Sequence, residues 1–269
     1  MPRISTLSIR RMKGATRVVC TTAYDAAFAT LADAAGVDVI LVGDSLGNTM
    51  LGFPSTIPVT ADMIAHHTAA VARARPNALV VADVPFAETA YPFEHLLTTC
   101  VRFVQHCGAD AVKIEGGVEL AETVLRLTRA GIPVMGHIGL LPQRINQIGG
   151  YRRYGKNEDE VAQLVADAKA IEAAGAFSLV GEMIDHDAAG KVAASVGIPL
   201  IGIGSGADCD GQIIVSTDIL GLTPGAVPSF AKKFADLGTL ARNAFEAYAG
   251  EVRGGTFPEK KKPQAPASK

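Results

Sequence analysis

Five apolar stretches of the chain each end on a polar side chain that can take part in chemistry. The stretches are 37–45, 78–85, 109–116, 132–139 and 176–183. Their polar residues are Asp44 with Ser45, Asp83, Lys113 with Glu115, His137 and Glu182. A buried strand that ends on an acid, a cation or an imidazole carries that side chain into a cleft. Five such strands together predict one shared active site at one end of a sheet.

Three of these residues are acids at the ends of successive predicted strands: Asp44, Asp83 and Glu115. Neighbouring carboxylates repel one another unless a cation or shared protons intervene. Oxygen ligands favour a hard cation, and few protein ligands leave room for water and substrate. We therefore expect a Mg²⁺ site, which Mn²⁺ could also fill. The alternative for each acid is that it caps a loop or pairs with a surface base.

Lys113 and Glu115 alternate along one strand, so both side chains point to the same face. A cation beside a metal site suits a substrate carboxylate or the charge that develops on an enolate. Two alternatives stay open: Lys113 could be a Schiff-base nucleophile with a lowered pKa, or it could form a structural pair with Glu115.

Glu182 leaves an apolar strand with no local partner in the sequence. Such surroundings would raise the pKa of Glu182 towards the range of a general base, whereas a loop acid exposed to water would keep its ordinary pKa. His137 could orient a substrate oxygen or a metal-bound water, or it could be a core histidine with satisfied hydrogen bonds.

Eight apolar strand-like runs alternate with segments of helical periodicity. The runs begin near residues 17, 38, 78, 111, 132, 176, 198 and 212, and the helical segments are 24–35, 60–74, 92–106, 118–130, 158–174 and 187–196. This order predicts a single α/β domain, a (β/α)8 TIM barrel. A doubly wound open sheet is the main rival, but it gathers its functional groups at one switch point rather than on five strand ends.

The domain boundaries follow from composition. We expect a catalytic barrel over 1–253 and a flexible tail over 254–269, because the tail is rich in Gly, Pro and Lys. A G-x-G-x-x-A string within 201–212 matches a dinucleotide fingerprint only weakly, since two aspartates and a glycine follow where a helix should begin.

Bulk properties narrow the classes of function. The net charge of −2 gives no field that would favour nucleic acid or anionic lipid. No apolar run is long enough to span a bilayer, and the basic N-terminus lacks the apolar core of a secretory signal. The four cysteines form no C-x-x-C pair. We expect a soluble cytoplasmic protein without nucleic-acid or membrane partners.

Several strings of the chain resemble one family. They include the stretch from TTAYDAAF to VGDSLGNTMLG, TIPVTADMIAHHTAAV, VKIEGG, PVMGHIGLLPQ, IGIGSGADCDGQ and FAKKF, in the same order over about residues 3 to 258. The chain is similar to the ketopantoate hydroxymethyltransferase family, also called 3-methyl-2-oxobutanoate hydroxymethyltransferase. The resemblance implies a (β/α)8 barrel of the phosphoenolpyruvate mutase/isocitrate lyase type and a homo-oligomer, commonly a decamer.

The resemblance also implies three sets of site residues. The set that holds Mg²⁺, directly or through water, is Asp44, Asp83 and Glu115. The set that binds substrate is Asp44, Ser45, Asp83, Lys113 and His137. The proton acceptor is Glu182.

The implied reaction moves a hydroxymethyl group from 5,10-methylenetetrahydrofolate to 3-methyl-2-oxobutanoate and gives 2-dehydropantoate, in pantothenate synthesis. The alternatives are another 2-oxo-acid lyase or aldolase of the same superfamily, and a barrel that binds a keto acid without catalysis. The chain departs from the family pattern at 152–155 and at Ser216 and Thr217. These departures bear on the loop over the site, on folate recognition and on the choice of keto acid.

Overall fold

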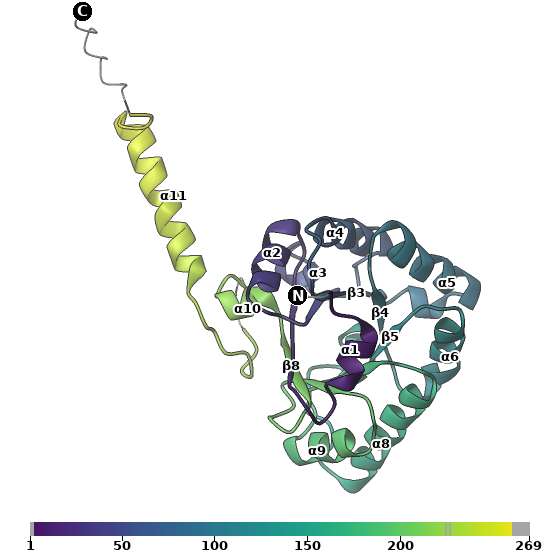
Figure 1. Cartoon of the computed structure of the whole chain (residues 1–269). Coiled ribbons are helices and arrows are strands. Elements are labelled where there is room, and N and C mark those ends of the chain that lie inside the picture. The colour runs from purple at the N-terminus through teal and green to yellow at the C-terminus, as the bar shows by residue number, and fades with distance from the viewer. Residues whose placement is uncertain (1–2, 224, 226, 260–269) are drawn as a thin grey trace, which may run out of the picture. The chain divides into compact units, whose positions relative to one another are not determined.

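The structure is a computed structural model that describes residues 3–223, 225 and 227–259. The chain forms two compact units, Met1–Ser216 and Thr217–Lys269. The first unit contains a closed barrel of parallel strands in sequence order (Figure 1). The strands are β1 (Val18–Thr22), β2 (Val39–Val42), β3 (Leu79–Asp83), β4 (Ala111–Glu115), β5 (Val134–Gly139), β6 (Ser178–Glu182), β7 (Leu200–Ile203) and β8 (Gly211–Ile214). The predicted (β/α)8 TIM barrel is confirmed, and the open sheet is wrong because β8 pairs with β1.

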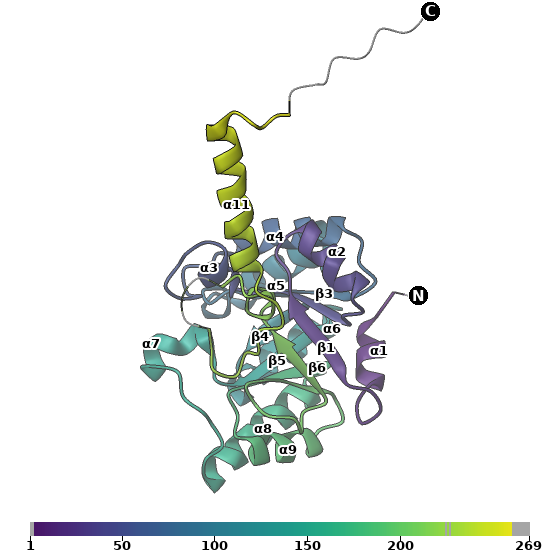
Figure 2. The same cartoon turned by 90° about the vertical axis from the view of Figure 1, so that its left-hand side faces the viewer.

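Helices surround the strands of the barrel (Figures 1 and 2). Each predicted helical segment coincides with one: α2 (Ala26–Ala34), α4 (Ala61–Arg73), α5 (Phe93–Val101), α6 (Ala121–Arg129), α8 (Glu158–Ala173) and α9 (His186–Ala194), of which α9 begins one residue before the predicted start. Shorter elements add to these: α1 (Thr6–Arg11), α3 (Leu46–Thr49), α7 (Ile145–Ile148), the 3₁₀ turns η1 (Glu88–Ala90), η3 (Val118–Leu120) and η4 (Pro142–Arg144), and the π-helical turn η2 (Arg102–His106). Residues 204–210 join β7 to β8 by bends and irregular backbone alone.

Side-chain caps explain where several helices begin. Asp25, Thr60 and Asn157 precede α2, α4 and α8, and each accepts a hydrogen bond from the backbone N–H three residues later. This bond satisfies one of the N–H groups that a helix start leaves without a partner.

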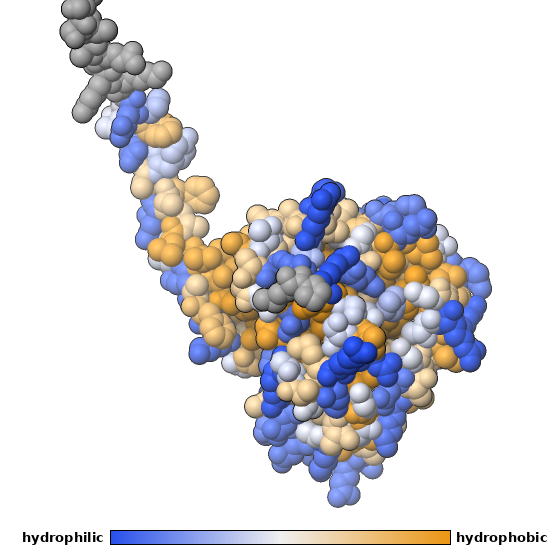
Figure 3. Space-filling model, in the orientation of Figure 1, coloured by the Kyte–Doolittle hydropathy of each residue, from blue (hydrophilic) through white to orange (hydrophobic). Residues whose placement is uncertain are grey.

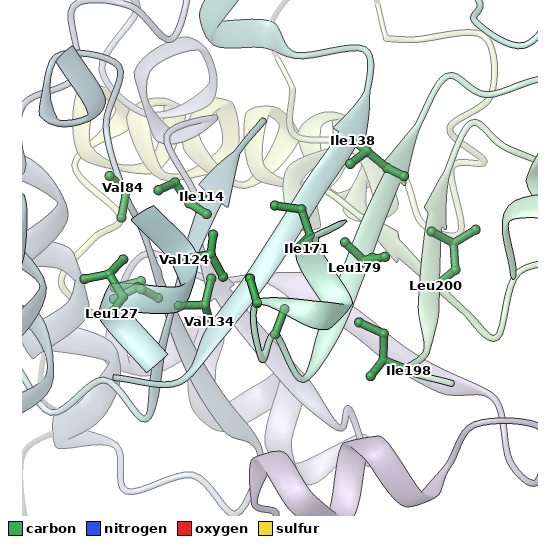
Figure 4. Packing of buried hydrophobic residues seen from close by; sticks show 14 of the residues in the cluster. Val84, Ile114, Val124, Leu127, Val134, Ile138, Ile171, Leu179, Ile198 and Leu200 are labelled. Carbon is green, nitrogen blue, oxygen red and sulfur yellow. The ribbon is translucent and has the colours of Figure 1, made fainter. Parts of the chain in front are cut away.

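The core has two layers because side chains alternate along each strand. One set of strand residues fills the inside of the barrel, together with Ile9 of α1. The other set packs outwards against the helices, where Val124 and Leu127 of α6 and Ile171 of α8 lie over β4, β5 and β6 (Figure 4). The strands are therefore covered on both faces, as their near-continuous apolar sequences require.

The second unit contains most of α10 (Ser216–Leu220) and the long helix α11 (Leu237–Gly254). No residue of α11 is buried, and apolar residues are visible along it (Figure 3). The expected division into 1–253 and 254–269 stays a prediction, and residues 260–269 lie outside the described residues. In the described part of the chain, no helix is long and apolar enough to cross a membrane.

Candidate active site

Strand alternation fixes which side chains point into the barrel. Ala111 belongs to the barrel interior, so Lys113 and Glu115, two and four residues later on β4, point the same way. By the same rule Asp83 points into the barrel, because it lies two residues after Val81, which belongs to the barrel interior. The register then sets Asp83 beside Lys113. A charged layer therefore lies on top of the apolar interior, at the carboxyl ends of the strands, where TIM-barrel active sites lie.

His137 and Glu182 complete this layer. His137 lies two residues after inward Met135 on β5, and Glu182 lies two residues after inward Val180 on β6. The register pairs His137 with Glu115. The structure thus brings together the polar ends of β3, β4, β5 and β6.

Lys113 is the central cation of the layer. Its Nζ lies 2.9 Å from Asp83 Oδ1, 3.6 Å from Glu115 Oε1 and 3.2 Å from His137 Nδ1. Burial alone would lower the pKa of Lys113, but the carboxylates of Asp83, Glu115 and Asp44 outweigh it and raise the pKa. Lys113 is therefore an ammonium ion, which disfavours the Schiff-base alternative because a nucleophilic amine needs a lowered pKa.

Asp44 and Asp83 form a buried acidic pair. Asp44 follows β2 after Gly43, and its backbone N–H donates to Asp83 Oδ2 over 3.0 Å. Burial raises the pKa of both acids, and the other carboxylates at the site raise it further. Asp83 Oδ1 is buried and accepts no hydrogen bond of good geometry, although Lys113 lies beside it. Two acids with this excess of negative charge suit a cation.

Glu115 differs from the two aspartates. Burial would raise the pKa of Glu115, but Lys113, His137 and the backbone N–H of Gln143 together lower it. Glu115 Oε2 accepts that N–H over 3.1 Å. The side chain is therefore ionised and held between two strands.

The donor set fits a hard cation that keeps most of its own water. In the described part of the chain, no three His, Cys, Asp or Glu side chains surround one point closely enough to hold a metal ion by themselves. Mg²⁺, however, is commonly bound through one or two carboxylates, with water and substrate as its other ligands. The buried Asp44–Asp83 pair is such a set, with Lys113 Nζ lying 2.9 Å from Asp83 Oδ1.

Gln143 is a site residue that the sequence did not single out. It lies in η4 directly after β5 and is 4% exposed. Its Nε2 donates to Asp44 Oδ2 and to the carbonyl of Val84, both over 2.9 Å. No sequence pattern predicts these two hydrogen bonds, because the position of the Gln143 side chain depends on how the chain turns after β5.

His137 bridges the lysine cluster and Glu182. Its Nδ1 lies 3.4 Å from Glu115 Oε1, and its Nε2 lies 3.3 Å from Glu182 Oε2. Burial and Lys113 would lower the pKa of His137, but the two glutamates raise it to about 9. Glu182 has no partner close to it in the sequence, and the partner that the structure gives it comes from the neighbouring strand β5.

The backbone around Glu182 is tightly constrained. Met183 has a φ of +50°, a left-handed conformation that is uncommon for a residue other than glycine. On β5, Gly139 has a φ of +89°, and a Cβ there would collide with the backbone of Glu182. Leu140 N–H also donates to the Glu182 carbonyl over 2.8 Å. The ends of β5 and β6 are thus held close, which fixes the direction of the Glu182 side chain.

Ser45 is held by a tyrosine rather than by the charged layer. Its Oγ lies 2.9 Å from the hydroxyl of Tyr24, which is buried just after β1. His67 Nδ1 in turn lies 2.7 Å from the Tyr24 carbonyl. Tyr24 is a second site residue that the sequence analysis missed. The neighbouring His66 and His67 have no place among the charged residues of the site.

Segment 152–155, where the sequence departs from the family pattern, is hydrogen-bonded to the loops that follow β6 and β7. Arg153 donates to the carbonyls of Ile184 and Gly204 over 2.8 and 2.7 Å. Tyr154 N–H donates to the Met183 carbonyl over 2.8 Å. Arg153 therefore fixes the chain beside Glu182. At Ser216, the other place where the sequence departs from the family pattern, the backbone N–H donates to Thr22 Oγ1 over 3.0 Å.

Solved structures define the fold class of the barrel. The barrel is similar to phosphonopyruvate hydrolase, with a TM-score of 0.63 and 14% identity over 95% of this chain and 89% of that chain. It is also similar to 2,3-dimethylmalate lyase, a PEP mutase/isocitrate lyase superfamily member, with a TM-score of 0.56 and 21% identity over 97% and 92%. At these identities the likeness shows the fold alone: a barrel of the type found in this superfamily.

The sequence defines the family within that class. The model of the ketopantoate hydroxymethyltransferase family matches residues 3–260. The 3-methyl-2-oxobutanoate hydroxymethyltransferase of Staphylothermus marinus is 49% identical over 97% of this chain and 96% of its own, and that of Pyrobaculum neutrophilum is 52% identical over 96% and 97%. The chain belongs to the ketopantoate hydroxymethyltransferase family. The predicted family and hydroxymethyltransferase class are thereby confirmed.

Proposed function

We propose that this enzyme transfers a one-carbon unit from 5,10-methylenetetrahydrofolate to C3 of 3-methyl-2-oxobutanoate and releases 2-dehydropantoate, a step of pantothenate synthesis. The family and the names of its relatives support the acceptor and the transfer. The observation that carries the proposal is the buried charged layer, in which an ammonium ion lies among carboxylates beside the His137–Glu182 pair.

Lys113 and Ser45 bind the carboxylate of the keto acid in this proposal. The ammonium of Lys113 is buried and held in place by Asp83, so it can meet an anion without first losing a large water shell. The Ser45 hydroxyl, fixed by Tyr24, adds a neutral hydrogen bond.

Asp44 and Asp83 would hold Mg²⁺, with Glu115 joining directly or through water, and Mn²⁺ would suit the same ligands. The buried oxygen donors and their raised pKa values support this assignment. When bound, the ion would draw electron density from the carboxylate and keto oxygens of the substrate and so acidify C3.

Glu182 accepts the proton from C3, and His137 holds Glu182 in place and lies on the substrate side. The electron pair of the broken C–H bond forms a C–C bond with the methylene carbon of the folate. One of the two carbon–nitrogen bonds of that methylene carbon breaks as the C–C bond forms, and its nitrogen takes up the proton from Glu182. The second carbon–nitrogen bond is then replaced by a C–O bond to water, whose proton goes to the other nitrogen, which gives 2-dehydropantoate and tetrahydrofolate.

Glu182→Gln tests the proposed base. With keto acid, methylenetetrahydrofolate and Mg²⁺ present, formation of dehydropantoate should fall by about 10²–10⁴-fold. Glu122→Gln, on the exposed side of α6, is the matched control and should leave the rate unchanged. An unchanged rate in Glu182→Gln would rule out this base. Trapping of the enzyme by borohydride together with activity in EDTA would favour the Schiff-base aldolase instead.

We also propose a cytoplasmic homo-oligomer, with a decamer as the form that the family resemblance implies. Light scattering coupled to size-exclusion chromatography of the full chain would give the number of subunits directly, and a monomer would contradict the proposal.

A further inference from the structure

Gln143 contacts both parts of the proposed metal site without carrying a charge. Its backbone N–H donates to Glu115 Oε2, and its side-chain Nε2 donates to Asp44 Oδ2. The second N–H of Nε2 donates to the carbonyl of Val84, just after β3. One buried residue of the β5 loop thus links the ends of β2, β3 and β4.

The neutrality of the amide determines what this link can do. Lys113 compensates the charge of Asp83, but an amide can hold Asp44 and leave its negative charge intact. The two aspartates are also tied in the same way: Oδ2 of Asp44 accepts the Gln143 amide, and Oδ2 of Asp83 accepts the Asp44 N–H. Asp44 Oδ1 is therefore left for a ligand, whereas Asp83 Oδ1 lies 2.9 Å from Lys113 Nζ.

We propose that Gln143 is a positioning residue for the metal site: it fixes the Asp44 carboxylate so that Oδ1 faces the ion, and it keeps Asp44 and Glu115 at a set separation. The inference rests on the proposed function, because it takes Asp44 as a metal ligand. Partners of metal ligands typically contribute about 10–100-fold to metal affinity.

The test measures binding of Mn²⁺ alone to the full chain by electron paramagnetic resonance, without substrate. Gln143→Met keeps the length of the side chain but has no N–H donors, and its Kd for Mn²⁺ should rise about 10–100-fold. Gln147→Met, on the exposed side of α7, is the matched control and should bind as the parent chain does. Equal Kd values for Gln143→Met and the parent would overturn the proposal while leaving the proposed function intact.

A second variant covers the case in which Gln143→Met does not fold. Gln143→Asn keeps the amide but withdraws it from Asp44 by one methylene, so its Kd should also rise. A parent-like Kd in Gln143→Asn would likewise overturn the proposal. A parent chain that binds no Mn²⁺ would overturn it together with the metal assignment of the proposed function.

Activity gives an independent readout that a merely structural role would not produce. If Gln143 acts through the ion, saturating Mg²⁺ should restore kcat in Gln143→Met, and the Mg²⁺ concentration for half-maximal rate should rise with the Kd for Mn²⁺. A lower kcat at every Mg²⁺ concentration, with an unchanged half-maximal concentration, would contradict the proposal.

Discussion

Acids at the amino-terminal end of the barrel accept hydrogen bonds from backbone N–H groups at the starts of strands, whereas acids at the carboxyl end lie beside other buried carboxylates. The backbone donors at the amino-terminal end are Val19 for Asp38, Ala78 for Asp33, Val80 for Asp110 and Leu200 for Asp210, all within 2.8–2.9 Å. Each bond satisfies an N–H at or near the start of a strand. These acids join the strands of the barrel to one another and to the preceding helices.

At the carboxyl end, the same residue type is left with unfavourable neighbours. Asp44 and Asp83 are both buried; Asp83 and Glu115 raise the electrostatic cost of ionising Asp44, and Glu115 raises that of ionising Asp83. Side-chain chemistry alone therefore does not separate a structural acid from a functional one. The difference lies in whether an acid has other buried carboxylates beside it, whose repulsion a bound cation would relieve.

The two lysines give the sharpest test of this contrast. Lys113→Met removes the buried ammonium that binds the substrate carboxylate in our proposal, so kcat/KM for the keto acid should fall by about 10³-fold. A steady-state assay at saturating folate and Mg²⁺ measures the loss. Activity within a few-fold of the parent would show that the charged layer does not bind the substrate.

Lys13→Met removes the matching cation at the other end. Lys13 Nζ lies 2.7 Å from Asp210 and 2.6 Å from the carbonyl of Ala193. Loss of both contacts should lower the free energy of unfolding by about 1–3 kcal/mol and leave kcat/KM unchanged. Urea unfolding followed by circular dichroism measures the first quantity. A catalytic defect in a stable Lys13→Met would break the division between the two ends.

Metal affinity should depend on pH at the carboxyl end. Because the pKa values of Asp44 and Asp83 are raised in the metal-free protein, protons compete with the ion at a pH where ordinary aspartates are already ionised. The association constant for Mn²⁺ should therefore rise with pH, by up to about tenfold per pH unit for each proton displaced. Calorimetric titrations at several pH values give this slope. A flat profile from acidic to neutral pH would contradict the raised pKa values.

The sequence predicts the barrel well because its evidence is local. Apolar runs of strand length and helical periods are read within one segment, and every predicted strand and helix is present. The polar strand ends are also located correctly, since alternation along a strand fixes the inward face. The sequence could not predict which side chains of different strands contact one another. The His137–Glu182 contact, for example, follows from the register of β5 and β6.

The same limit explains the residues that were missed. Gln143 reaches Asp44 because η4 turns the chain back over the barrel, and Tyr24 reaches Ser45 because β1 and β2 are adjacent. Neither contact has a spacing in the sequence that could reveal it. The first contact depends on closure of the sheet and the second on the pairing of β1 with β2, and a single segment specifies neither.

The smallest expected effect concerns stability, and we expect a gain at the carboxyl end only. Asp44→Asn should raise the free energy of unfolding of the metal-free protein at neutral pH by about 1–2 kcal/mol, because a neutral amide removes repulsion from Asp83 and Glu115 and can still accept the Gln143 bond. The pKa of Asp44 is raised on folding, so the parent loses stability as the pH rises from the unfolded-state pKa through the folded-state pKa. The gain should therefore vanish at acidic pH.

Asp38→Asn, which weakens the bond from Val19 N–H, should show no gain at either pH. Urea unfolding at both pH values measures these differences, and a loss of stability in Asp44→Asn at neutral pH would show that the acids at the carboxyl end also stabilise the fold.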